Sequence, residues 1–336
     1  MRKNTLWMLC VIALIIAAGA AAVKMHPEAS RTAASRVKAL TDTGGLAWPA
    51  ACQVIEIRSS VDGRIQKAYY YRTSSQAARP LVVSLHGWSS DFSKGDSLAA
   101  LALEHDWNYV HPDFRGPGRT VDACLSEKVI SDIDDAITDA IGRGGVDANN
   151  VFVAGASGGG YATAGMYLRS RHAVRAFIAW VPITDLRAWY RESLSRGNEY
   201  AGDILSCTSS GEKLDEEAAI RRSPLYWDLP ASPRGIIELY AGIDDGHSGP
   251  VPVSHSLLFY NRIVEKYGDA ERAVTPEEIA ALLNRTSPRD ADSETISGRR
   301  VILHRGTGYA SVTIFEGGHE MLAHYCFERM SAIAGH

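Results

Sequence analysis

The chain has 336 residues, of which 46% are apolar and 22% are charged. These values are ordinary for a protein that buries a hydrophobic core, and the length suits one large catalytic domain or two small ones. The net charge of −4 provides no basic surface for nucleic acid or an anionic membrane. We therefore expect no nucleic-acid partner.

Residues 1–23 form a candidate export signal. Arg2 and Lys3 precede an apolar run over residues 6–23, which is rich in Leu, Ile and Ala and ends in small residues. A positive start, an apolar centre and a small-residue exit are typical of a secretory signal. The run also reaches the lower limit of a bilayer span, so an uncleaved membrane tether is the alternative. Either way, the sequence predicts a secreted or periplasmic protein.

Export would place the cysteines in an oxidising compartment. Cys10 lies inside the apolar run, and the other cysteines have neither CxxC nor metal-ligand spacing. Four cysteines allow three pairings, so the sequence alone does not decide among them. We expect two disulfides, Cys124–Cys207 and Cys52–Cys326.

Residues 24–49 are small, polar and poorly periodic, and we expect them to form a linker. The catalytic domain is expected over residues 50–336. It should begin with two strands, 54–57 and 67–71, because the Asp62-Gly63 step between them is typical of a hairpin turn.

From Leu81 onwards, short apolar runs alternate with amphipathic stretches. Runs this short and uniformly apolar are typical of parallel strands buried on both faces. The expected strands are 81–85, 109–111, 151–154, 176–180, 236–240 and 312–315, and the expected helices include 131–141, 253–266 and 321–334. This alternation predicts an α/β fold with a mostly parallel central sheet and helices on both faces.

Two stretches interrupt the alternation. Residues 184–232 are too many for an ordinary connection and contain several aromatic side chains, among them Trp189. We expect a lid-like insertion that covers a site, with Trp189 in its substrate-binding wall; packing alone is the alternative. Residues 268–300 should hold one short helix, which starts at Thr275-Pro276 with an N-cap and an N1 proline.

The strongest chemical signal is Gly155-Ala156-Ser157-Gly158-Gly159, which fits G-x-S-x-G between an apolar strand and a helix. Such a turn holds the serine in a strained conformation and brings strand and helix so close that flanking side chains would clash. We expect Ser157 to be a nucleophile, with Ala156 beside the substrate. A glycine-rich turn without chemistry is the alternative.

A serine hydroxyl needs a base, usually a histidine that is oriented by a carboxylate. In the order serine, acid, histidine, His319 follows the last apolar strand and is the expected base of Ser157. Asp244 and Asp245 both follow the strand before it, and only one can face His319. His247 is a rival base that is too close to the acid in sequence, and we expect it to line the site instead.

An acyl-transfer enzyme also needs donors for the oxyanion of its tetrahedral intermediate. The backbone N–H of Gly158, directly after the nucleophile, is one expected donor. The strand over 81–85 leads into His86-Gly87-Trp88, so the backbone N–H of Trp88 is the other. His86 and Gly87 should shape this loop and contact the substrate.

Aspartates gather on the helix over 131–141, whose opposite face is rich in isoleucine. They are Asp132, Asp134, Asp135 and Asp139. We interpret them as a solvent-facing surface and not as a metal site. No zinc, calcium or phosphate-loop motif is present in the sequence, so no metal or cofactor is expected.

Taken in order, these motifs resemble the catalytic domain of the prolyl-oligopeptidase-like group of α/β-hydrolases, which acetyl-xylan-esterase-like members share. The resemblance covers residues from about Val54 to the C-terminus. It rests on His86-Gly87-Trp88, Asp113-Phe114-Arg115-Gly116-Pro117, the Gly155–Gly159 turn, Ser223-Pro224-Leu225, Gly242-Ile243-Asp244-Asp245 and Gly317-Gly318-His319-Glu320. It implies an α/β-hydrolase fold, and it implies Asp245 as the acid because that residue lies three positions after Gly242.

The chain leaves no room for the β-propeller of true prolyl oligopeptidases, which favours a small-molecule or carbohydrate ester as the substrate. The expected function is therefore a serine carboxylic-ester hydrolase. A serine exopeptidase with the same residues is the alternative, and a non-catalytic binding protein on this scaffold is a third. The sequence does not reveal the oligomeric state.

Overall fold

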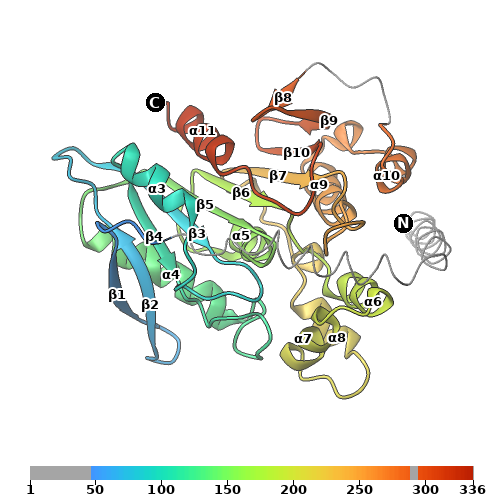
Figure 1. Cartoon of the computed structure of the whole chain (residues 1–336), viewed down its shortest axis with the longest axis horizontal. Helices are drawn as coiled ribbons and strands as arrows, with labels where there is room; N and C mark the ends of the chain where they lie inside the picture. Colours follow the sequence, from blue (N-terminus) through green and yellow to red (C-terminus); the bar gives the residue numbers. More distant parts are fainter. Residues whose placement is uncertain (1–46, 288–293, 336) are drawn as a thin grey trace.

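The computed structural model describes residues 47–287 and 294–335, which form a large sheet covered by helices (Figure 1). Within these residues ten strands lie in the order β1-β2-β4-β3-β5-β6-β7-β10-β9-β8. The strands are β1 (Gln53–Arg58), β2 (Ile65–Tyr71), β3 (Arg79–Leu85), β4 (Asn108–Pro112), β5 (Val146–Ala156), β6 (Ala176–Trp180), β7 (Ile236–Gly242), β8 (Thr295–Ile296), β9 (Arg299–Gly306) and β10 (Ala310–Phe315). The α/β fold with a mostly parallel sheet is confirmed.

The centre of the sheet is parallel from β4 through β3, β5, β6 and β7 to β10. The predicted apolar runs lie within these strands, and the side chains of those runs are almost all buried. The predicted hairpin of β1 and β2 adds antiparallel strands at one edge, and β9 and β8 add antiparallel strands at the other. Because parallel strands end at the same edge of a sheet, the residues after β3, β5, β7 and β10 come together there.

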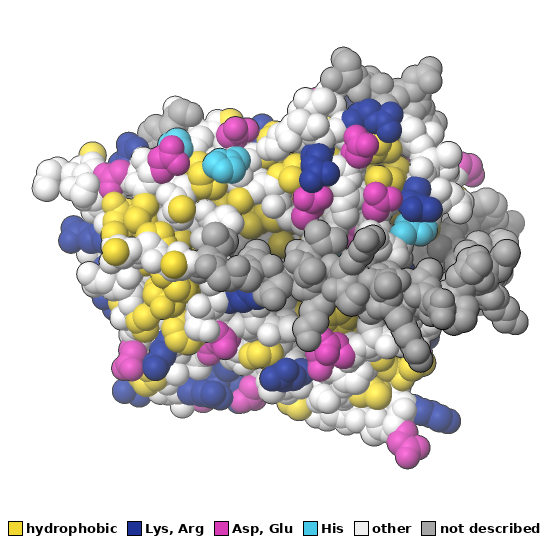
Figure 2. Space-filling model, viewed as in Figure 1, with side chains coloured by type: hydrophobic (Ala, Val, Ile, Leu, Met, Phe, Trp, Pro, Cys, Tyr) yellow, Lys and Arg dark blue, Asp and Glu magenta, His cyan; other side chains and the backbone are white. Residues whose placement is uncertain are grey.

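The hairpin edge stays in contact with solvent. Val54, Val61 and Ile65 are the exposed large hydrophobic residues of this hairpin. Figure 2 shows hydrophobic side chains gathered where Figure 1 places β1 and β2, whereas cationic and anionic side chains are interspersed over the rest of this face.

Helices cover both faces of the sheet. They are α3 (Ser97–Glu104), α4 (Glu127–Gly142), α5 (Gly158–Arg169), α6 (Leu186–Arg196), α7 (Tyr200–Cys207), α8 (Glu216–Arg221), α9 (Ser254–Tyr267), α10 (Pro276–Leu283) and α11 (Ala323–Ala334), with 3-10 turns at Pro224–Tyr226 and Ala270–Arg272. Right-handed crossovers place α4, α5 and α9 on one face and α3 on the other, because only the β3–α3–β4 connection runs in the opposite direction. Helix α11 packs beside α3.

The lid-like insertion consists of α6, α7 and α8, which lie beyond the edge of the sheet in Figure 1. Helix α6 begins at the N-cap Asp185, whose carboxylate accepts from the backbone N–H groups of Arg187 and Ala188. Helix α10 begins at Thr275 with a capping box to Glu278, as the sequence predicts.

The expectation that the aspartates of α4 face solvent is wrong for three of the four. Asp132 and Asp134 are 2% exposed and Asp135 is 8% exposed, so only Asp139 lies on the surface as expected. Ser170 Oγ donates to Asp134 at 2.6 Å, and Arg171 donates to Asp135 at 2.6 Å. Helical periodicity identifies the face that packs on the sheet, but it does not reveal that loops cover the opposite face.

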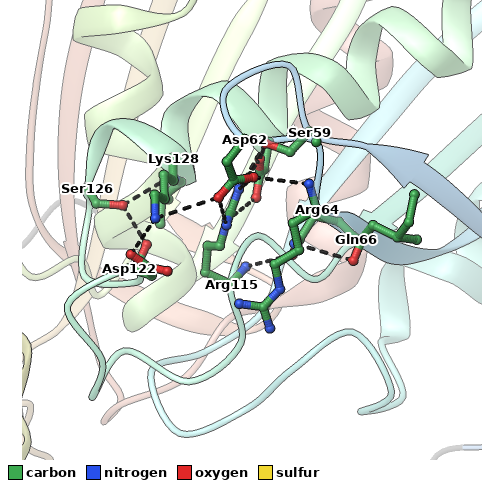
Figure 3. Close-up of polar contacts among 12 residues, drawn as sticks. Ser59, Asp62, Arg64, Gln66, Arg115, Asp122, Ser126 and Lys128 are labelled. Atoms are coloured by element: carbon green, nitrogen blue, oxygen red, sulfur yellow. Dashed lines mark hydrogen bonds and ion pairs between the residues drawn. The ribbon is translucent and has the colours of Figure 1, made fainter.

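The hairpin and the loop after β4 cover Asp132. Figure 3 shows Arg115 of this loop beside Ser59 and Asp62 of the hairpin. Arg115 is fully buried at its side chain, and its Nε donates to Asp132 at 2.6 Å. The same guanidinium donates to both Asp62 oxygens, at 2.8 and 3.0 Å, and Ser59 Oγ donates to Asp132 at 2.6 Å. This network joins the β1–β2 turn to α4 at the edge of the sheet that is remote from β10.

The disulfide Cys124–Cys207 is confirmed and connects the loop before α4 to the end of α7. The expected pair Cys52–Cys326 is wrong, because both of these cysteines are free. Cys52 lies directly before β1 at an edge of the sheet, whereas Cys326 is fully buried in α11, which packs against β6 near the middle. The order of cysteines along the sequence does not show that these elements are separated in the fold.

The predicted export signal or anchor over residues 1–23, and residues 24–46 of the predicted linker, lie outside the described residues. Trp48, within the predicted linker, stacks on Tyr69 with ring centroids 3.9 Å apart, so packing of the domain begins there. Among the helices of the described part, none combines the length and apolarity needed to cross a membrane.

Candidate active site

Ser157 occupies a sharp turn between the end of β5 and the start of α5. Its backbone has φ 59° and ψ −116°, a conformation that is strained for a residue with a side chain. The turn is tight because a Cβ added at Gly155 would lie 2.6 Å from the backbone of Gly159. The backbone N–H of Ser157 donates to the Trp180 carbonyl oxygen at 2.9 Å, and Ser157 remains partly exposed. The turn thus presents the Ser157 side chain at the carboxyl edge of the sheet, with Ala156 partly buried just before it.

His319 and Asp245 lie after β10 and β7 and are hydrogen bonded to each other. His319 Nδ1 is 2.7 Å from Asp245 Oδ2. The other Asp245 oxygen accepts from the backbone N–H groups of Gly246 and Val251, both at 3.0 Å. A carboxylate that accepts on both oxygens favours the tautomer with a proton on Nδ1. Nε2 of His319 then carries a lone pair that can accept a proton, and this atom is buried with no hydrogen-bond partner in this structure.

The two adjacent aspartates have different surroundings. Asp244 is partly exposed and lies 3.7 Å from the Arg285 guanidinium, whereas Asp245 is 2% exposed and faces His319. His247 is exposed, and its Nε2 is 2.8 Å from the carbonyl oxygen at the last residue of α10. The geometry therefore distinguishes Asp245 from Asp244 as the partner of His319.

Strand order brings the serine and the histidine to one edge of the sheet. Strands β5, β6, β7 and β10 are consecutive parallel neighbours, so Ser157 and His319 follow strand ends on the same side. The Ser157–His319 hydrogen bond is not formed in this structure. Such bonds are often long without substrate and tighten when substrate binds.

Trp88 and Gly158 provide adjacent backbone N–H groups beside the serine. A Cβ added at Gly158 would lie 2.2 Å from the Trp88 nitrogen, so the two peptide units are in contact. Gly158 begins α5, where the first N–H groups have no partner within the helix. The Trp88 carbonyl accepts from the Gly118 N–H at 2.7 Å, which fixes the orientation of its loop. Two such donors at a helix N-terminus can stabilise a developing oxyanion.

His86 supports this loop from below. It is buried, stacks on Phe114 with centroids 3.9 Å apart, and places its ring nitrogens 3.0 Å from the Gly87 carbonyl and 2.7 Å from the Asp113 carbonyl. Burial lowers the pKa of His86. A neutral imidazole donates through one ring nitrogen, so His86 can hydrogen bond one of these two carbonyl oxygens and help to hold the His86–Trp88 loop in place.

The insertion contacts the same loop through aromatic side chains. Trp88 Nε1 donates to Asp203 of α7 at 3.0 Å, and the Trp88 ring meets Trp189 of α6 edge to face at 4.8 Å. Trp189 is fully buried, and its Nε1 donates to the Pro250 carbonyl at 3.0 Å. Trp189 therefore connects the insertion to the His86–Trp88 loop, called the oxyanion loop below, and to the loop after Asp245.

A small pocket lies behind the oxyanion loop. It has a volume of about 20 Å³, and its lining includes Gly158, Trp88, Leu125 and Tyr161. Apolar side chains dominate this lining, and a cavity of this size holds about one water molecule, so it is too small to bind a group of the substrate. Within residues 47–287 and 294–335, no group of three or more His, Cys, Asp or Glu side chains is arranged to hold a metal ion.

Sequence reasoning missed two parts of this region. Asp203 bonds the Trp88 ring, and Arg196, at the end of α6, donates through Nη1 to the Gly249 carbonyl at 3.0 Å. Both residues lie in the insertion, which carries no motif. Only the folding of the insertion over the sheet edge brings them to the site.

Comparison with known proteins agrees with this geometry. Residues 96–220, which include Ser157, match the family model described as the prolyl oligopeptidase family. A search among curated proteins gives no significant sequence match.

Solved structures with the same fold include acylaminoacyl peptidase of Pyrococcus horikoshii, with 15% identity, TM-score 0.59 and coverage of 84% of this chain and 41% of that one. A puromycin-hydrolysing peptidase of Mycobacterium tuberculosis has 15% identity, TM-score 0.55 and coverage of 87% and 39%. Prolyl oligopeptidase B of Galerina marginata has 14% identity, TM-score 0.53 and coverage of 64% and 31%. The chain thus spans about two fifths or less of the length of these structures.

The fold and the strand-end serine define an enzyme of the serine hydrolase superfamily with an α/β-hydrolase fold. Within that class, the resemblance to the prolyl-oligopeptidase-like group seen in the motifs is confirmed by the family match over residues 96–220 and by the shared fold.

Proposed function

We propose that the protein is a serine peptidase that cleaves an amide bond of a small peptide or acylated amino acid through an acyl-enzyme. The observation that carries the proposal is the His319–Asp245 pair at 2.7 Å, placed after β10 and β7 at the same edge of the sheet as the Ser157 turn. The solved structures of similar fold support the choice of an amide, since their names describe peptidases. This replaces a carboxylic ester, expected from the sequence, as the leading substrate class.

In the proposed mechanism, Ser157 Oγ attacks the substrate carbonyl carbon while His319 Nε2 takes the hydroxyl proton. Asp245 stabilises the resulting imidazolium through Nδ1. The C=O electron pair moves onto oxygen, where the N–H groups of Gly158 and Trp88 donate to it. The tetrahedral intermediate then collapses, the C–N bond breaks, and His319 returns the proton to the leaving amine.

Deacylation repeats these steps with water. His319 Nε2 takes a proton from the water, whose oxygen attacks the acyl carbon, and the ester bond to Ser157 breaks. The proton returns to Ser157 Oγ and the carboxylic acid departs. The mechanism uses only side chains and backbone groups of this chain.

Export of the protein is part of the proposal. The apolar run over residues 6–23 would direct the chain to the secretory pathway, and the Cys124–Cys207 disulfide is consistent with an oxidising compartment. The substrate would then be an extracytoplasmic peptide or amide.

The test compares amides with esters on the purified protein. We expect aminoacyl and acyl-aminoacyl p-nitroanilides to be hydrolysed, with Ser157→Ala abolishing turnover. p-Nitrophenyl acetate and butyrate serve as reference substrates, because an activated ester is easier to cleave than an amide. Turnover of the esters with none of any anilide would favour the esterase, and equal turnover by wild type and Ser157→Ala would refute both.

A further inference from the structure

Arg196 lies at the end of α6, beside the loop that packs against the His319–Asp245 pair. Its Nη1 is 3.0 Å from the Gly249 carbonyl oxygen. A Cβ added at Gly249 would lie 2.2 Å from Asp245 Oδ1 and 2.8 Å from His319 Cβ. The guanidinium is therefore anchored one peptide unit away from the catalytic acid and base.

The charge of Arg196 has no carboxylate partner among the described residues. Its hydrogen bond to Gly249 uses one donor of a guanidinium that carries several in a rigid fork. Glu192, one turn earlier on α6, lies 3.4 Å from His255 Nε2 and forms no ion pair with Arg196. By contrast, Arg191 on the same helix pairs with Glu216 on α8.

The surroundings of Arg196 make an unpaired cation costly. Burial lowers the pKa of Arg196, while the charges of Glu192 and Asp245 act in the opposite direction. The side chain of Arg196 is only partly buried, and none of its nitrogens is a fully buried atom without a partner. The fork is therefore held at one end by Gly249 and accessible at the other.

We propose that Arg196 is a specificity residue that binds a carboxylate of the substrate next to the scissile bond. The proposal rests on the peptidase function above, since a peptide can offer either a terminal or a side-chain carboxylate. Arginine suits this role because its planar fork matches the two oxygens of a carboxylate. The anchor to Gly249 fixes the position of the fork relative to His319.

The kinetic test uses matched peptides that differ only in charge. Acetyl-Ala-Ala is compared with its C-terminal amide, and acetyl-Ala-Asp-amide with acetyl-Ala-Asn-amide, so the two pairs separate a terminal from a side-chain carboxylate. Wild type should prefer the acidic member of one pair in kcat/KM by about 10- to 100-fold, the size of one charge-assisted interaction. Arg196→Gln should lose this preference but keep its rate on the neutral member, and Arg196→Lys should retain part of it.

The matched control is Arg191→Gln, which removes a cation of the same helix that already has a carboxylate partner. It should leave the preference of wild type unchanged. An equal loss by Arg196→Gln on both members of a pair would show a merely structural role and overturn the proposal. Wild type that shows no preference in either pair would also overturn it.

A binding measurement separates this proposal from the proposed function. Isothermal titration of Ser157→Ala with both members of each peptide pair needs no turnover, and it is repeated in Ser157→Ala/Arg196→Gln. Tighter binding of the acidic member of one pair that depends on Arg196 supports the carboxylate site even if no peptide is cleaved. Equal binding of the acidic and the neutral member in both pairs, with peptides cleaved by wild type, would overturn the site and leave the peptidase standing.

Discussion

Replacing Gly249 with alanine would place a methyl group against the pair that activates the serine. The added Cβ would lie 2.2 Å from Asp245 Oδ1, although contacts below 3.4 Å are already tight. The carboxylate must therefore retreat by about 1 Å. Because the His319 Nδ1–Asp245 Oδ2 distance is 2.7 Å, a shift of that size breaks the hydrogen bond that orients the base.

The expected effect is on the chemical step. A misplacement of about 1 Å in a catalytic group can reduce the rate by about 100-fold, which corresponds to about 2.7 kcal/mol of barrier. KM for a neutral substrate should change little, because Gly249 contacts the acid and the base of the triad, and Arg196 is proposed to bind only a carboxylate. The backbone φ of Gly249 is not in the left-handed region, so the substitution adds no backbone strain.

The assay is steady-state hydrolysis by Gly249→Ala of the best p-nitroanilide or p-nitrophenyl substrate. Gly202→Ala, in α7, is the matched control, because a Cβ there would meet nothing within 4 Å. Circular dichroism and thermal melting establish that both variants are folded. A folded Gly249→Ala with the kcat of wild type would refute the view that this glycine is required by the Asp245–His319 geometry.

Four further substitutions test the roles of single contacts. Asp245→Asn should lower kcat by about 10⁴-fold by favouring the wrong histidine tautomer, whereas Asp244→Asn, measured beside it, should leave kcat near wild type. Cys207→Ser opens a disulfide between residues 83 positions apart, so melting under non-reducing conditions should report a loss of about 4 kcal/mol; an unchanged Tm would contradict this. Arg115→Met leaves the buried Asp132 carboxylate without its cation and should cost about 3–5 kcal/mol in urea unfolding, and a cost within error of zero would exclude a stabilising pair.

The central strands could be predicted from the sequence because both of their faces are buried. Runs such as Val151–Ala154 are uniformly apolar and contain β-branched and aromatic residues, which is the pattern of strands buried on both faces. Strand β9 was not predicted, because it lies near the edge of the sheet and begins with two exposed arginines, Arg299 and Arg300. The burial of Asp132 on α4 was also missed, since its partners Arg115 and Ser59 belong to other elements that only the fold brings to this helix.

Ser157, Asp245 and His319 could be proposed from the sequence because each lies within four residues of the end of a parallel strand, whereas the family resemblance favoured Asp245 over Asp244. The backbone donor at Trp88 follows β3 for the same reason. Arg196 and the Trp88–Asp203 bond could not be predicted, because the insertion carries no periodic signal that says which of its faces meets the sheet edge. Of the two predicted disulfides, only Cys124–Cys207 is present. Sequence spacing does not show how far Cys52, beside β1, lies from Cys326 in α11.

The most direct test of the account is covalent labelling of the serine. The protein is treated with a fluorophosphonate, and the adduct is located by peptide mapping and mass spectrometry. We expect a single adduct on Ser157, with labelling that is lost in His319→Ala although Ser157 is still present, because the hydroxyl then has no base. Rapid labelling of Ser157 in His319→Ala, or an adduct on another residue with Ser157 unmodified, would contradict the assignment of Ser157 as a nucleophile activated by His319 and Asp245.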